Sequence, residues 1–130
     1  MDNCIFCKVA NKLVPHFPVY EDGDVLAFLD AFPTVVGHTL VIPKQHFSHL
    51  SNTPDEIRIK MLKAVDKIIP VLKEVTESSY IMIMIAGIDI EHFHIHLIPK
   101  HLDSPELPKP KMTPEEFEKL RAKIAIKMPA

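Results

Sequence analysis

The sequence lacks an excess of charge of either sign. It has 15 lysine and arginine residues against 17 aspartate and glutamate residues, which gives a formal net charge of −2 at pH 7. Such a chain has no extended positive field that would attract nucleic acid or an anionic membrane surface. We therefore expect neither as a partner, and any anionic ligand must be held by a few local groups.

Long hydrophobic runs are also missing. Residues 1–16, MDNCIFCKVANKLVPH, carry polar side chains every few positions and lack the continuous apolar core of a signal peptide. No later run of about 18 apolar residues could span a bilayer. These features predict a cytoplasmic protein without a membrane partner.

Cysteine is scarce, with only Cys4 and Cys7 in the chain. A chain of 130 residues can bury a core without disulfides, and we expect one domain over residues 1–130. In a reducing compartment, a single Cys-x-x-Cys motif indicates a metal site or a redox pair more than a structural disulfide. A redox role is less favoured because the motif lacks the strand-then-helix context of thioredoxin-like pairs.

Histidine, in contrast, is abundant, with eight residues. Two thiolates supply half of a tetrahedral zinc shell, and histidines are the usual remainder. Sequence spacing does not choose among the candidates for the missing ligands, which are His16, His38, His46, His49 and the histidines at 92, 94 and 96.

Four apolar runs predict strands. Residues 25–32 and 38–44 read as neighbouring strands joined by a turn near Gly37. Residues 80–87, YIMIMIAG, are apolar and β-branched enough for a largely buried strand, and residues 90–99 follow with strict period-two alternation. We expect the last two strands to pair antiparallel.

One long helix is predicted after the second strand. Thr53, Pro54 and Glu56 have the spacing of an N-cap, a first-turn proline and a capping box. Pro70 is expected to kink or end this helix. Its apolar positions recur every three or four residues, at Ile57, Met61, Val65, Ile68 and Leu72.

The C-terminal part contains a loop and a second helix. Residues 102–112 are rich in proline and read as a loop after a core over residues 1–101. A capping box at Thr113 and Glu116 predicts a helix over residues 113–128, with an apolar stripe at Phe117, Leu120 and Ile124. Strands mostly joined by short links, with one long and one terminal helix, predict an α+β fold on an antiparallel sheet.

The stretch EHFHIHLIPK places three histidines at alternate positions. On a strand, His92, His94 and His96 would share one face, about 6.5–7 Å apart along the backbone. This spacing suits a row of imidazoles around a phosphate better than three ligands converging on one metal. An exposed polar face is the alternative, although such faces normally mix threonine, lysine, glutamate and serine.

A histidine in such a cluster is suited to nucleophilic catalysis. Imidazole has an unperturbed pKa near about 6.5, and neighbouring histidines disfavour protonation further. A neutral nitrogen can attack phosphorus and form a phosphohistidine, which splits one displacement into two steps. His94, with a histidine on each side, is the best-placed nucleophile.

The motifs HFHIHLIP, GHTLVIPKQHF, VLAFLDAFP and CIFCKVA together resemble the histidine triad (HIT) family of nucleotide hydrolases and transferases. The resemblance covers most of residues 3–101 in the family's order. It implies a five-stranded antiparallel sheet with a long helix, usually a homodimer, and cleavage of nucleoside 5′-phosphate derivatives through a nucleotidyl-histidine intermediate.

The resemblance also implies roles for individual residues. His94 would be the nucleophile, His96 its neighbour on the α-phosphate, and His38 a supporting group, while Asp30 would accept hydrogen bonds from the ribose hydroxyls. The base pocket would be formed by Ile5, Phe6, Phe28 and Leu29. Zinc-bearing members look like this chain at Cys4, Cys7, His46 and His92, which implies a structural zinc with four protein ligands. From pattern alone, Ile5, Phe6 and Phe28 read as core residues and Asp30 as a turn-capping carboxylate.

The loop before the triad departs from the family pattern. Many phosphoramidase-like members carry a glycine-rich loop ending in Gly-Gln-Ser or Gly-Gln-Thr, whereas this chain has Ile88 and Asp89 at the last two positions. Gly87 still offers a backbone N–H for nucleotide binding. Asp89 would repel an anion unless it turns away, or it would assist an amine leaving group.

We therefore expect a hydrolase of purine nucleoside 5′-phosphoramidates or dinucleoside polyphosphates that releases a nucleoside monophosphate. The alternative from another class is a nucleotide-binding or interaction module with little or no catalysis. A third hypothesis is a zinc hydrolase that holds the triad on the metal.

Overall fold

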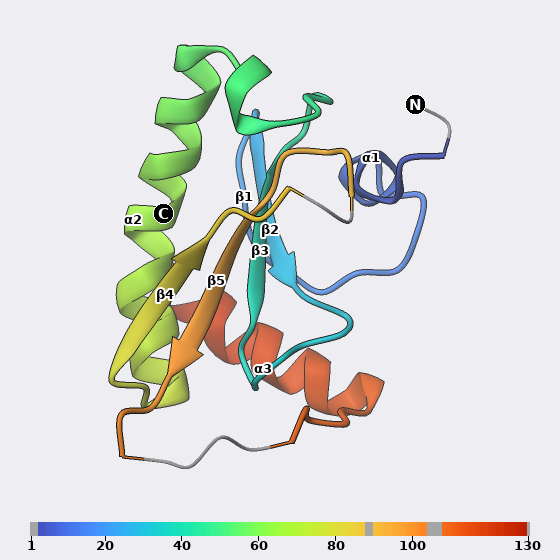
Figure 1. Cartoon of the computed structure of the whole chain (residues 1–130). Helices are drawn as coiled ribbons and strands as arrows, with labels where there is room; N and C mark the ends of the chain where they lie inside the picture. The colour runs from blue at the N-terminus through green and yellow to red at the C-terminus, as the bar shows by residue number, and fades with distance from the viewer. Residues whose placement is uncertain (1–2, 88–89, 104–107, 130) are drawn as a thin grey trace.

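The computed structural model describes residues 3–87, 90–103 and 108–129. Its centre is a five-stranded antiparallel sheet in the order β1-β2-β3-β5-β4 (Figure 1). The strands are β1 Pro18–Glu21, β2 Val25–Leu29, β3 Thr39–Pro43, β4 Tyr80–Met84 and β5 Ile95–Lys100. The helices are α1 Ile5–Ala10, α2 Asp55–Thr76 and α3 Pro114–Lys127, with a short 3₁₀ helix, η1 Leu50–Asn52. The predicted α+β fold with one long helix and a C-terminal helix is confirmed.

Both faces of the central strands are buried. Alternate side chains of β2 and β3, such as Ala27 and Val41, join the larger core with α2 and α3. The intervening side chains, such as Phe28 and Leu40, join a smaller core with Phe6 of α1. Figure 1 shows α2 and α1 on opposite sides of the sheet. Burial on both faces explains why these strands read as continuous apolar runs.

The link between β2 and β3 requires a glycine. Gly37 has a φ of +92°, and a Cβ atom there would lie 2.6 Å from Cγ2 of Thr76 at the end of α2. The backbone of Asp30 then donates to the carbonyl of His38 at 2.9 Å and closes the connection. The two predicted neighbouring strands and their turn are confirmed, with Asp30 and His38 facing each other at the ends of the strands.

Helix α2 begins one residue later than the sequence predicts. Thr53 is not the N-cap, because Pro54 occupies that position and its carbonyl accepts the N–H groups of Ile57 and Arg58. The hydroxyl of Thr53 donates to the carbonyl of His49 at 2.7 Å. The helix also continues through Pro70 to Thr76, so of the two expected effects, a kink or an end, the end does not occur. Its predicted apolar stripe is confirmed, since Met61, Val65, Ile68 and Leu72 are all buried.

The last two strands pair antiparallel as expected, but two expectations about them are wrong. Strand β4 is the outer strand, and Tyr80 and Ile83 are 45% and 49% exposed rather than buried. Strand β5 begins at Ile95, not at residue 90. The reason is a hydrogen bond outside the sheet. The N–H of Phe93 donates to the carbonyl of Phe47, which belongs to no strand.

Helix α3 packs against β1 and α2 of its own chain. The capping box of Thr113 and Glu116 forms as predicted, and Phe117 and Ile124 are buried in the larger core. The ring of Phe117 stacks on Phe17 with centroids 5.1 Å apart. Across the described residues, no helix combines the length and the apolar character that crossing a membrane demands.

Candidate active site and metal centre

A cavity of about 430 Å³ opens beside α1 on the face of the sheet opposite to α2. All residues expected in the base pocket line it, namely Ile5, Phe6, Phe28 and Leu29. Asp30, His94 and His96 line the same cavity. Its volume falls in the range of about 300–1,000 Å³ that is usual for small-molecule sites. The pattern-based view of Ile5, Phe6 and Phe28 as core residues is also partly right, because Phe6 and Phe28 pack in the smaller core while forming the cavity wall.

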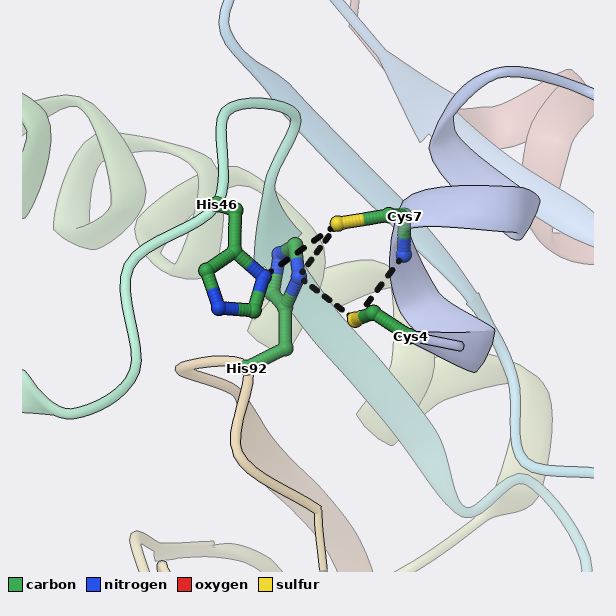
Figure 2. A group of neighbouring side chains, drawn as sticks. All are labelled: Cys4, Cys7, His46 and His92. Carbon is green, nitrogen blue, oxygen red and sulfur yellow. Dashed lines mark hydrogen bonds between the residues drawn. The ribbon is translucent and has the colours of Figure 1, made fainter. Parts of the chain in front are cut away.

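A second group of side chains lies at the N-terminal end of α1 (Figure 2). The ligand atoms of Cys4, Cys7, His46 and His92 all lie within 4.8 Å of one another. The Nδ1 of His92 is 3.3 Å from the Sγ of Cys4, and the Nδ1 of His46 is 3.2 Å from the Sγ of Cys7. The structure thus selects His46 and His92 from the histidines that sequence spacing left open.

This cluster fits a tetrahedral zinc ion. Zinc bonds of about 2.3 Å to sulfur and about 2.0–2.1 Å to nitrogen place sulfur and nitrogen about 3.5 Å apart. The observed sulfur–nitrogen separations of 3.2–3.4 Å are close to this value. Two thiols and two imidazoles are also a donor set that zinc prefers in structural sites.

A hydrogen bond to the backbone sets the tautomer of His92. Its Nε2 lies 2.9 Å from the carbonyl oxygen of Pro43, and because a carbonyl can only accept, Nε2 carries the proton. The lone pair is therefore on Nδ1, which faces the two sulfurs. Burial lowers the pKa of His92, which favours this neutral form. Burial and the neighbouring Cys4 raise the pKa of the Cys7 thiol to about 11, so metal binding must release a proton there.

His94 has the opposite tautomer. Its Nδ1 lies 2.7 Å from the carbonyl oxygen of His92 and must donate to it. In the neutral ring the lone pair is then on Nε2. The ring stands against Phe6, with centroids 5.1 Å apart, and against His96, with centroids 4.9 Å apart. His94 lines the 430 Å³ cavity, and a neutral imidazole nitrogen is a group that can act as a nucleophile.

His96 and His38 form a hydrogen-bonded pair. The backbone N–H of Thr34 donates to Nδ1 of His38, which leaves the proton of His38 on Nε2. That Nε2 lies 2.9 Å from Nδ1 of His96, so His96 accepts there and carries its own proton on Nε2. Burial lowers the pKa of His38 and favours the neutral ring, and Asp30, whose Oδ2 is 3.5 Å from Nε2, opposes this.

Asp30 begins the turn after β2. Its Oδ1 accepts the backbone N–H of Phe32 at 2.8 Å, which is the turn-capping role that the pattern predicts. The same side chain lines the cavity, so the carboxylate is available to ligand hydroxyls as well. The two interpretations of Asp30 are therefore compatible.

Gly87 lies on the other side of His94, where both border a second cavity of about 510 Å³. Its φ of +68° is in the left-handed region, which favours glycine. Ile88 and Asp89, the positions where the loop departs from the family pattern, lie outside the described residues.

His16 is one of the histidines that sequence spacing leaves open as a metal ligand. It is absent from the cysteine cluster and instead lines the 430 Å³ cavity between Val14 and Phe17. Residues 14–17 precede β1 and belong to no regular element, so hydrophobic periodicity gives no signal for the direction of the side chain.

Comparisons with known proteins identify similar chains. Residues 11–103 match the HIT domain. The chain is 47% identical over 107 residues to a HIT-like protein of Borreliella burgdorferi, covering 77% of each chain. It is 34% identical over 134 residues to a protein of Schizosaccharomyces pombe named adenosine 5′-monophosphoramidase hnt1, covering 97% of this chain and 98% of that one.

A solved structure is similar over nearly the whole chain. It is a zinc-bound histidine triad family protein of Mycobacterium smegmatis, which matches with a TM-score of 0.83 and 30% identity over 96% of this chain and 95% of that one. In this chain the three histidines of the triad have different hydrogen-bond partners. All three lie within residues 11–103, the region that matches the HIT domain. This chain belongs to the HIT domain family.

Proposed function

We propose that the protein is a hydrolase that cleaves nucleoside 5′-phosphoramidates or dinucleoside polyphosphates through a nucleotidyl intermediate on His94. One observation carries the proposal: the hydrogen bond from Nδ1 of His94 to the His92 carbonyl leaves the lone pair on Nε2, beside a mostly apolar cavity. The S. pombe relative is named an adenosine 5′-monophosphoramidase, which supports the substrate class.

The proposed reaction has two displacements at the α-phosphorus. Nε2 of His94 attacks in line, and a nitrogen–phosphorus bond forms. The amine or phosphate leaves with the electron pair of the broken bond and receives a proton from a neighbouring donor. Water then attacks the phosphorus, and His94 leaves as the nucleoside monophosphate is released. The N–H at Nε2 of His96 stabilises charge on a phosphoryl oxygen, and Asp30 accepts from the ribose hydroxyls.

Replacing His94 tests this mechanism. His94→Asn should abolish turnover of adenosine 5′-phosphoramidate and leave the thermal unfolding temperature within a few degrees of the wild type. His101→Asn is the matched control, because His101 is exposed and lies outside both cavities. Full activity in His94→Asn would rule out the nucleotidyl-histidine.

We also propose that Cys4, Cys7, His46 and His92 hold one structural zinc ion. When bound, zinc would link α1 to the segments that follow β3 and precede β5, with no open position for a substrate. His92 is the only triad member in this cluster of described residues, which argues against a zinc hydrolase with all three histidines on the metal. A metal-stripped protein that stays folded and active would exclude that alternative.

Metal analysis tests the zinc proposal directly. We expect about one zinc per chain in the wild type and much less in Cys4→Ser. A preparation without metal, purified in the absence of chelators and still stably folded, would remove the proposal.

The second candidate function is a nucleotide-binding module without efficient chemistry. Ile88 and Asp89 favour it, since they stand where many family members have glutamine and serine or threonine. Substrates with amine, phosphate and sugar leaving groups distinguish the two. Binding of adenosine monophosphate with no turnover on any substrate would favour the module.

We further propose a homodimer that uses the outer strand β4. Among the described residues, no strand pairs with the outer edge of β4, and Tyr80, Ile83 and Met84 expose large apolar side chains on this strand. Ile83→Lys should shift the mass measured by light scattering from dimer to monomer. Ile59→Lys, at a similarly exposed apolar residue of α2, should not. A monomeric wild type at micromolar concentration would refute this proposal.

A further inference from the structure

The 430 Å³ cavity has very few polar side chains. Within the described part of the chain, those that line it with a polar group are His16, Asp30, His94 and His96, and the rest are apolar or aromatic. The proposed function assigns Asp30 to the ribose and both triad histidines to the phosphate. His16 is therefore the lining side chain with hydrogen-bonding capacity that has no assigned partner on the nucleotide.

A series of ring contacts links His16 to His94 through two other aromatic rings of the cavity wall. Phe6 packs edge-on against His94, with centroids 5.1 Å apart. Phe28 packs edge-on against Phe6 at 5.7 Å, and His16 packs edge-on against Phe28 at 6.3 Å. Two aromatic rings thus stand between His94 and His16, which is the order expected if the phosphate lies at one end and the base at the other.

The backbone fixes which nitrogen of His16 can accept. Nδ1 lies 3.1 Å from the carbonyl oxygen of Val14, and because a carbonyl cannot donate, Nδ1 carries the proton. In the neutral ring Nε2 is then an acceptor. Among the residues that the structure describes, no protein group is hydrogen-bonded to this Nε2. His16 is partly exposed, so a ligand in the cavity can reach the ring.

We infer that His16 is a specificity-determining residue, whose Nε2 accepts a hydrogen bond from the 6-amino group of adenine. This inference rests on the proposed nucleotide site. Adenine has a donor at C6, whereas hypoxanthine has an oxygen there, which would set two acceptors against each other. The base of purine riboside has neither a donor nor an oxygen at C6. It therefore gains no hydrogen bond from His16 and is not repelled by it.

The size of the preference follows from ordinary hydrogen-bond energetics. One neutral hydrogen bond corresponds to about a 2- to 10-fold preference for adenosine over purine riboside. Setting the acceptor of His16 opposite an oxygen of the base makes the preference over inosine larger, about 10- to 100-fold.

Three substrates and two variants test the inference. We would measure kcat/KM for the 5′-phosphoramidates of adenosine, purine riboside and inosine with wild type, His16→Phe and His101→Phe. Phenylalanine keeps the ring against Phe28 but removes the acceptor. The wild type and His101→Phe should prefer adenosine, whereas all three substrates should react with His16→Phe at rates within about twofold of one another. His16→Ala replaces His16→Phe if the latter does not fold.

Two results would overturn the inference: equal rates for all three substrates in the wild type, or an unchanged adenosine preference in the variant at residue 16. Binding affinities of adenosine monophosphate and inosine monophosphate, measured by calorimetry, distinguish failure of the His16 inference from failure of the proposed hydrolase. Without any turnover the hydrolase is refuted, while a binding preference for adenosine monophosphate that is lost in His16→Phe still supports the role of His16. Equal affinity of the wild type for the two nucleotides refutes the role of His16.

Discussion

Replacing His38 would test whether the protein sets the tautomer of His96. His38 is buried, its Nδ1 accepts from the backbone of Thr34, and its Nε2 donates to Nδ1 of His96 at 2.9 Å. His38→Leu removes that donor and keeps an apolar side chain of similar length. Nδ1 of His96 then loses the hydrogen bond from His38, which holds the proton of the ring on Nε2.

The expected magnitude follows from these contacts. Thr34 is exposed, so water can accept from its N–H, and the main cost falls on the buried acceptor of His96. A buried polar group without a partner costs about 1–3 kcal/mol. If His96 donates from Nε2 to the phosphoryl oxygen in the transition state, this cost reduces kcat by about 10- to 100-fold.

The assay should separate positioning from general damage. We would measure kcat and KM for adenosine 5′-phosphoramidate in His38→Leu and His38→Gln, since the amide of glutamine can still donate to His96. Glutamine should recover part of the lost kcat, and nitrogen-15 chemical shifts of His96 should show a mixture of tautomers only in the leucine variant. A folded His38→Leu with normal kcat and an unchanged His96 tautomer would refute the reasoning.

Three further predictions concern stability. Burial lowers the pKa of His38 below its ordinary value of 6.5, so the unfolded chain binds a proton at this residue at a higher pH than the folded chain does. The free energy of unfolding, measured by urea denaturation, should therefore decrease below about pH 6.5. It should decrease less in His38→Gln. Gly37→Ala should destabilise the protein by about 2–4 kcal/mol, because φ is +92° and the new Cβ would lie 2.6 Å from Thr76. Gly23→Ala is the control: a Cβ there would have no atom within 4 Å, so stability should change by less than about 1 kcal/mol. A chelator should lower the thermal unfolding temperature of the wild type by several degrees and leave that of Cys4→Ser unchanged, as measured by calorimetry.

Local patterns predicted the elements well where local hydrogen bonds form them. The capping box at Thr113 and Glu116 formed as expected because both partners lie within one turn. Thr53 is not the cap because the first helical hydrogen bonds, from the N–H groups of Ile57 and Arg58, go to the carbonyl of Pro54, one residue later. The exposure of β4 could not be read from its apolar residues, since position at the edge of a sheet is decided by the pairing of all five strands.

The sequence by itself determined strands β2 to β5, the long and the C-terminal helix, the resemblance to a known family and the set of residues that could carry chemistry, because these depend on residue type and spacing. Helix α1 and strand β1 were not among the predicted elements. The tertiary structure decided how the three triad histidines differ. Carbonyls of Pro43 and His92 and the ring of His38 assign the protons of His92, His94 and His96, and two of these three partners lie more than 40 residues away in the chain. It also decided that His46 joins the cysteines while His16 lines the cavity, since only the folded chain brings distant segments within hydrogen-bonding distance.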